Sequence, residues 1–135
     1  MVTATATYQG SLRTICRHEK SNIEIQTDAP TDNNGKGENF SPTDLMATAY
    51  ISCMLTIIGI HCHKQSLEFN FGKGTVSKKM TLSPRKIGEL IIEIDLRNNN
   101  WTEEQCIEIK EAAINCPVAL SFSENTKIQT NFIFQ

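Results

Sequence analysis

The segment from Leu45 to Ile60 has no charged side chain, and a strong helix start precedes it. Ser41 supplies a hydroxyl N-cap, Pro42 fills the first helical position, and Asp44 follows where it can reach back to the cap. Apolar residues then recur on nearly every side of a helix expected to run from Pro42 to about His63. Such a helix must be covered all round, which limits how the chain can fold.

This apolar segment is poorly suited to crossing a membrane. A transmembrane helix needs about 20 consecutive apolar residues, whereas Thr48, Ser52, Thr56 and Gly59 dilute this run. The segment also has no polybasic flank. We therefore expect a buried helix and no membrane partner.

Length and charge restrict the class of protein further. The 135 residues predict a single domain over 1–135, and the net charge of −2 gives no basic surface for nucleic acid. The N-terminal sequence MVTATATYQG lacks the features of a secretory signal, which favours the cytoplasm. In that compartment the five cysteines are expected to be mostly reduced.

The rest of the chain alternates between strand and helix patterns. Period-two alternation predicts half-buried antiparallel strands, and Thr102 with Gln105 predicts a capping box for a second helix that ends at Cys116, before Pro117. A loop is expected over 28–39. The order of these elements is that of an α+β protein. The predicted strands cover residues 3–8, 22–27, 67–71, 89–97 and 127–134.

A single antiparallel sheet covers only one side of a helix. The remaining side of the 42–63 helix needs another layer, and a chain of this length has little left to supply one. A second copy of the chain is the simplest source. We expect a homodimer with the two long helices packed in the middle.

Two cysteines are the leading candidates for chemistry. Cys53 lies in the apolar helix, and Cys116 stands at a helix break before proline. A thiolate can attack a peroxide to form a sulfenic acid, which condenses with a second thiol to a disulfide. Cys106 is a rival partner for Cys53 on the same helical stripe as Cys116. A free cysteine is also often simply a small buried hydrophobe, so both interpretations remain open.

A reactive thiol at neutral pH needs its thiolate stabilised, and Cys53 is too far into its helix for the helix dipole to do this. A cation is required, and Arg13 and Arg17 in the early strands are the natural candidates. Consecutive residues such as His61 to His63 point in different directions on a helix, so no metal site is expected. No phosphate-binding glycine loop is present either.

Two segments resemble the signature segments of the OsmC/Ohr family of osmotically inducible and organic hydroperoxide resistance proteins. They are SPTDLMATAYISCM, which contains Cys53, and NCPVALSF, which contains Cys116. The resemblance implies antiparallel sheets wrapped around long central helices in an intertwined homodimer, with active sites at the subunit interface. It also implies that Cys53 is the peroxidatic thiol and Cys116 the resolving thiol. The family's arginine falls on Arg13, with Arg17 as the alternative.

One position departs from the family pattern. Hydroperoxide reductases of this family have a glutamate directly after the proline, where this chain has Thr43. Threonine cannot form the ion pair that orients the arginine, so Glu38 or Asp44 must supply it, or it is absent. This departure favours a broader OsmC-like branch.

The resemblance implies an antioxidant peroxidase that reduces organic hydroperoxides to alcohols under oxidative stress. It would use no metal or flavin cofactor, and each cycle would need an external dithiol, of lipoyl type or another, to reduce the Cys53–Cys116 disulfide. The alternatives are a non-catalytic OsmC-like dimer that binds a small apolar ligand, or a thiol redox sensor.

Overall fold

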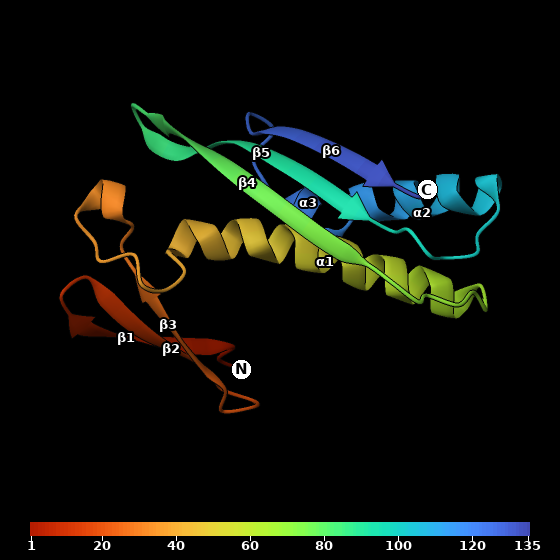
Figure 1. The fold of residues 1–135 in the computed structure, drawn as a ribbon. Helices are drawn as coiled ribbons and strands as arrows, with labels where there is room; N and C mark the ends of the chain where they lie inside the picture. Colours follow the sequence, from red (N-terminus) through yellow and green to blue (C-terminus); the bar gives the residue numbers. More distant parts are fainter. The chain divides into compact units, whose positions relative to one another are not determined.

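The computed structural model describes residues 1–135. The chain divides into two compact units, Met1–Met46 and Ala47–Gln135, and each contains its own three-stranded sheet. The long helix α1 (Pro42–Lys64) begins at the end of the first unit and continues through the second. Strands and helices alternate as in the predicted α+β class (Figure 1). That residues 1–135 act as a single domain stays a prediction.

The first unit is an antiparallel meander of β1 (Ala4–Gly10), β2 (Arg13–His18) and β3 (Glu24–Asp28). The predicted strands over 3–8 and 22–27 are confirmed to within two residues at each end. The register places Arg13 directly opposite Asp28. The last residue of β3 and the first residue of β2 are therefore neighbours.

A loop then leads to the start of α1. It contains one short 3-10 turn, η1 (Thr31–Asn33), in the segment predicted to be a loop. The predicted cap is confirmed, because the Asp44 backbone N–H donates to Ser41 Oγ at 3.0 Å and the Ser41 N–H donates to the Asp44 carboxylate at 2.9 Å. Two backbone donors at the helix start are thereby satisfied.

The second unit has a mixed sheet. β4 (Lys73–Leu82) pairs antiparallel with β5 (Arg85–Asp95), which pairs in parallel with β6 (Lys127–Ile133). The prediction that all strands are antiparallel is therefore wrong for β6. Between β5 and β6 the chain passes through α2 (Glu103–Ile114) and α3 (Pro117–Ser121), a crossover long enough to return it to the same end of the sheet.

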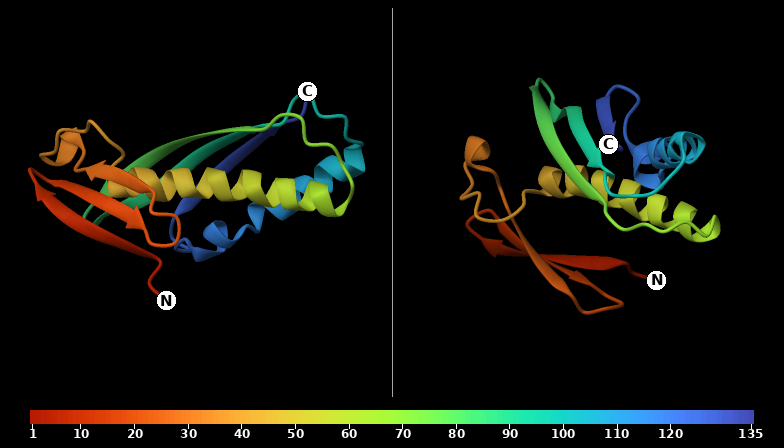
Figure 2. Two further views of the ribbon diagram at one scale, coloured as in Figure 1. Left: turned by 90° about the horizontal axis from the view of Figure 1, so that it is seen from below. Right: turned by 45° about the vertical axis from the view of Figure 1, so that its right-hand side comes forward.

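The core of this unit lies between one face of the sheet and the helices α1 and α2 (Figures 1 and 2). The alternating residues of β5 and the following Leu96 are buried to 1% exposure or less, as the period-two pattern predicted. One stripe of α1 packs against them. Its buried members are Ala47, Tyr50, Met54, Ile58 and Cys62.

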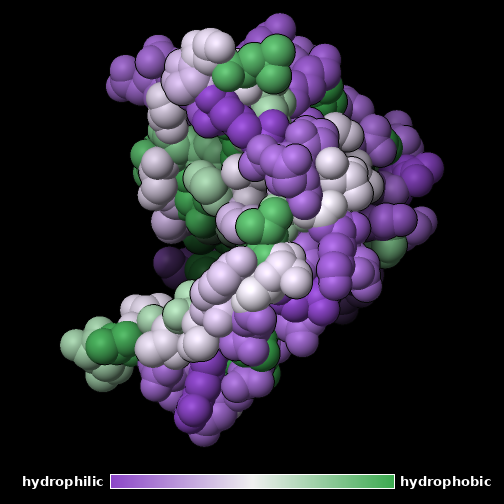
Figure 3. All heavy atoms as spheres, turned by 90° about the vertical axis from the view of Figure 1, so that its left-hand side faces the viewer, coloured by the Kyte–Doolittle hydropathy of each residue, from purple (hydrophilic) through white to green (hydrophobic).

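The other elements of the second unit leave the opposite face of α1 uncovered, the side for which the sequence analysis expected a second copy of the chain. Met46 is 50% exposed and Ile60 is 44% exposed. By length and composition α1 is also apolar enough to cross a membrane, a test that the core helix of a soluble protein passes too. Figure 3 shows exposed hydrophobic residues in green on a face that is otherwise mostly hydrophilic.

The predicted strand over 67–71 is wrong, because this segment forms no strand. The Asn99 side chain occupies the backbone groups that a neighbouring strand would have paired. Its Oδ1 accepts from the N–H groups of Asn70 and Phe71, and its Nδ2 donates to the Phe71 carbonyl. The strand that pairs with β5 is instead β4, whose alternation is masked in the sequence by lysines and a glycine.

The predicted capping box of α2 is confirmed, and it provides a test of local stability. Thr102 Oγ1 accepts from the Gln105 N–H at 3.2 Å, and the Gln105 side chain accepts from the Thr102 N–H at 2.9 Å. We expect Thr102→Ala to lower the free energy of unfolding by about 1 kcal/mol. Urea unfolding measures this, with Glu111→Ala on the exposed side of α2 as the matched control. Equal stability of the two variants would contradict the assignment.

Candidate functional site

The structure brings the thiols of Cys53 and Cys116 together. Cys53 lies half-buried on α1, and Cys116 is fully buried where α2 gives way to α3. Burial raises the pKa of the Cys116 thiol, a bond from the Ala119 N–H lowers it, and a side-chain hydrogen bond with Cys53 raises it further. The Cys53 thiol therefore lies close enough to Cys116 to raise the pKa of that thiol.

Cys116 owes its position to a break between two helices. α2 ends at Ile114, two residues earlier than predicted, and Pro117 starts α3. Cys116 itself is extended, with φ −65° and ψ 152°, and its Sγ accepts a hydrogen bond from the Ala119 N–H at 3.4 Å. Proline at the first position of a helix fixes this geometry, because it favours extended backbone in the residue before it.

An apolar wall formed by Tyr50 and Phe122 lies near Cys116. Tyr50 lies one turn before Cys53 on α1, and its ring contacts Phe122 edge-to-face at a centroid distance of 5.1 Å. Burial raises the pKa of Tyr50, and the nearby Cys116 adds to the rise. Met54 is fully buried beside Cys53 in the chain.

The other cysteines have separate environments. Cys106 lines a surface pocket of about 440 Å³ together with Trp101, Glu103, Phe134 and Gln135. It precedes Cys116 by ten positions in the chain, and its rival pairing with Cys53 stays a prediction. Cys62 is buried further along α1, where burial raises its pKa. Cys16 belongs to β2 in the first unit.

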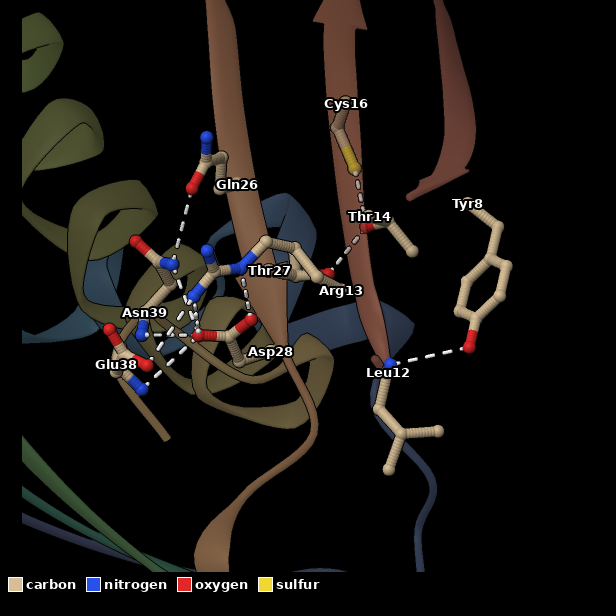
Figure 4. A network of polar contacts seen from close by, with 10 residues as sticks. All are labelled: Tyr8, Leu12, Arg13, Thr14, Cys16, Gln26, Thr27, Asp28, Glu38 and Asn39. Carbon is tan, nitrogen blue, oxygen red and sulfur yellow. Dashed lines mark hydrogen bonds and ion pairs between the residues drawn. The ribbon is translucent and has the colours of Figure 1, made fainter. Parts of the chain in front are cut away.

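In the first unit, Arg13 is held by a buried carboxylate (Figure 4). Its Nε donates to Asp28 Oδ1 at 2.7 Å, and its Nη2 donates to Oδ2 at 2.9 Å. Glu38 is a second, more distant carboxylate beside the same nitrogen, with its Oε1 at 3.8 Å from Nη2. Asp28 is only 1% exposed. This bidentate pair fixes the plane of the guanidinium, because two parallel hydrogen bonds permit one orientation.

Asp28 also organises the loop that follows it. Its Oδ2 accepts from the backbone N–H groups of Glu38 and Asn39 at 3.2 and 3.1 Å, and from the Asn39 side-chain amide at 3.1 Å. One carboxylate thus connects the strand that carries Arg13 to the far end of the loop. These donors, like Arg13, favour its charged form.

Asp28 should make stability depend on pH in a defined window. Its pKa falls from an ordinary 3.8 to about 2, mainly because of the hydrogen bonds from Arg13 and against the effect of burial. A lowered pKa contributes stability above the ordinary value, and this contribution is lost as pH falls from about 4 to about 2. We expect the gap in unfolding free energy between the native chain and Asp28→Asn to shrink over that window. Urea unfolding at several pH values measures the gap, and a constant gap would contradict the prediction.

The remaining candidates from the sequence lie as follows. Asp44 caps α1 through Ser41, and the Thr43 hydroxyl lies 3.2 Å from Ser41 Oγ. Arg17 donates to the Asn22 side chain. The sequence analysis missed Asp28, the bidentate partner of Arg13. The available signal was its place at the end of a strand, but only the strand register shows that it faces Arg13.

No group of three or more His, Cys, Asp or Glu residues could hold a metal ion. The candidate site residues described above are two neighbouring cysteines in the second unit and an oriented arginine in the first.

Comparison with known proteins shows the family. A family model described as OsmC-like protein matches residues 35–131. A solved structure of a proposed osmotic stress induced and detoxification response protein from Psychrobacter arcticus is 43% identical, with a TM-score of 0.90, over 100% of this chain and 96% of that chain. None of the curated proteins matches this chain.

More distant solved structures share the fold. An organic hydroperoxide resistance protein OsmC from Legionella pneumophila is 16% identical, with a TM-score of 0.74, over 96% of this chain and 94% of that chain. The organic hydroperoxide resistance protein OhrB of Bacillus subtilis is 19% identical, with a TM-score of 0.67, over 97% of this chain and 98% of that chain. The resemblance seen in the sequence is confirmed, and the chain belongs to the OsmC-like family.

Proposed function

We propose that this protein is a thiol-dependent peroxidase that reduces organic hydroperoxides to alcohols. The observation that carries the proposal is the proximity of Cys53 and Cys116 in the core of the second unit, because a peroxidatic thiol needs a second thiol nearby. Two of the distant structural relatives are named as organic hydroperoxide resistance proteins. The proposal extends that activity to this chain.

The proposed reaction has two steps. The Cys53 thiolate attacks the terminal hydroxyl oxygen of ROOH, the O–O bond breaks so that Cys53 becomes a sulfenic acid, and the departing alkoxide takes a proton to become ROH. The Cys116 thiolate then attacks the sulfur of the Cys53 sulfenic acid and releases the hydroxyl oxygen as water. The two thiols supply both electrons, and the product is a Cys53–Cys116 disulfide.

Of the two, Cys53 is the better candidate for the first attack. It is half-buried, whereas Cys116 is fully buried with a raised pKa. A peroxide can reach only an accessible sulfur, and the thiolate rather than the thiol is the nucleophile. Cys116 is suited to act second, on a sulfur already beside it.

Arg13 is proposed to stabilise the Cys53 thiolate and the leaving oxygen in a homodimer. The apolar residues Tyr8 and Ile25 project from one face of the first unit's sheet and are 64% and 46% exposed. The uncovered face of α1 adds Ile60. A second copy of the chain would cover such surfaces. Asp28 is proposed to hold the guanidinium in the orientation that this role needs.

The apolar wall favours hydroperoxides with a lipid-like or aryl group over hydrogen peroxide. Tyr50 and Phe122 supply that wall. Regeneration would need a dithiol, of lipoyl type or another, because each cycle ends in a disulfide. The setting proposed for this antioxidant activity is the cytoplasm.

Counting free thiols tests the proposal. One equivalent of cumene hydroperoxide should remove two of the five thiols per chain, and peptide mapping should join Cys53 to Cys116. The matched control Cys106→Ser should lose the same two thiols. If no thiol is lost, the thiols are passive, and a non-catalytic dimer that binds a small apolar ligand becomes the better account.

A further inference from the structure

We propose that the reductant attacks the Cys53 sulfur of the disulfide, and that Cys116 is always the sulfur that leaves. The inference rests on the proposed disulfide chemistry and specifies how the disulfide is reduced back to two thiols. It is carried by the different surroundings of the two sulfurs, since one is half-buried on α1 and the other has no exposed surface.

Access decides which sulfur can be attacked. In thiol–disulfide exchange the incoming thiolate approaches along the S–S axis, from the side opposite the leaving sulfur. Cys53 is partly exposed and can be approached by an incoming thiolate, whereas Cys116 is enclosed by the core. Cys116 has 0% exposure within one chain, and a second subunit can only add cover.

The site also contains a hydrogen-bond donor to the leaving sulfur. The Ala119 N–H already donates to Cys116 Sγ at 3.4 Å. This bond favours a thiolate at Cys116 over a neutral thiol, since an N–H donor stabilises negative charge on sulfur. Burial works in the opposite direction and raises the pKa of Cys116. Part of the rise also comes from Cys53, and that part disappears once Cys53 is bonded to the reductant.

Access to each sulfur outweighs these opposing effects on the pKa of Cys116. A lower leaving-group pKa speeds exchange only gradually, whereas a blocked line of approach prevents attack on that sulfur altogether. The pKa of Cys116 therefore affects how fast the disulfide opens, and its burial determines which bond forms.

The reductive steps balance as follows. One thiolate of the dithiol bonds to Cys53 Sγ, the Cys53–Cys116 bond breaks, and its electron pair leaves on Cys116, which later takes a proton. The second thiolate of the dithiol then attacks the first sulfur of the reductant. Cys53 is released as a thiolate, and the reductant becomes a disulfide.

A trapping experiment tests the direction of attack. The disulfide is made in two ways, with cumene hydroperoxide and with the thiol oxidant diamide, and is opened with 2-mercaptoethanol, a monothiol. Acid quenching at successive short times is followed by alkylation with N-ethylmaleimide and tryptic mapping. Cleavage after Lys110 and Lys127 isolates Cys116, and fragmentation separates Cys53 from Cys62 on their shared peptide.

At the earliest quench we expect at least about tenfold more 2-mercaptoethanol on Cys53 than on Cys116, with N-ethylmaleimide on Cys116. Equal labelling, or more monothiol on Cys116, would overturn the inference. A disulfide formed by diamide but not by hydroperoxide would refute the peroxidase proposal and leave the direction of attack to be read from the diamide sample. If neither oxidant joins the two sulfurs, both proposals fail. The control Cys106→Ser should give the native pattern.

Discussion

Replacing Cys53 with serine is expected to lower kcat/KM for cumene hydroperoxide by a factor of at least about 1000, a loss of about 4 kcal/mol of transition-state stabilisation. A hydroxyl cannot replace the thiolate, because it remains protonated at neutral pH and does not form a sulfenic acid. Loss of peroxide in the presence of dithiothreitol measures the effect. Activity within tenfold of the native protein would show that Cys53 is not the nucleophile.

Cys116→Ser and Cys106→Ser make this comparison specific. Cys116→Ser should still consume one equivalent of hydroperoxide and should accumulate a sulfenic acid at Cys53, because only the second thiol is missing. Trapping with dimedone and mass spectrometry detects that species. Cys106→Ser should behave as the native protein, since Cys106 lies in the pocket beside Trp101 and Phe134.

Asp28→Asn is expected to lower kcat/KM by about 10- to 100-fold, the scale typical for loss of a group that orients a catalytic one. The amide can accept only one of the two hydrogen bonds that Arg13 donates to the carboxylate, and it brings no charge. The guanidinium would lose its fixed orientation. The Cys53 thiolate should then be less stabilised, and the pH at which the thiol reacts at half its maximal rate should rise.

That pH shift separates positioning from folding. Asn39→Ala is the matched control, because it removes one hydrogen bond to Asp28 but leaves the pair with Arg13 intact. It should reduce stability without moving the pH profile of alkylation by iodoacetamide. If Asn39→Ala and Asp28→Asn move the pH profile equally, or neither moves it, then Asp28 stabilises the loop and does not orient Arg13 for the reaction.

The features that the sequence predicted correctly depend on neighbouring residues. The reciprocal bonds of Ser41 with Asp44 and of Thr102 with Gln105 involve residues three apart, so their pattern is visible in the sequence. The buried alternation of β5 is equally local, since every second residue faces the core. The pairing of Cys53 with Cys116, which the family resemblance implies, stays a prediction.

The features that were missed depend on residues distant in the chain. Asn99, about thirty positions away, bonds backbone groups at the end of the 67–71 segment, and the direction of β6 follows from the crossover before it. Asp28 could be recognised as the partner of Arg13 only from the register of β2 and β3. The family pattern directed attention to Glu38 and Asp44, because the family's own carboxylate follows the proline.

The most direct test of the account is multiple turnover by the purified protein. With cumene hydroperoxide in large excess, dithiothreitol as the only reductant and no other protein present, we expect many equivalents of hydroperoxide to be converted to alcohol per chain. Consumption that stops at one equivalent per chain would contradict a peroxidase and leave a thiol redox sensor.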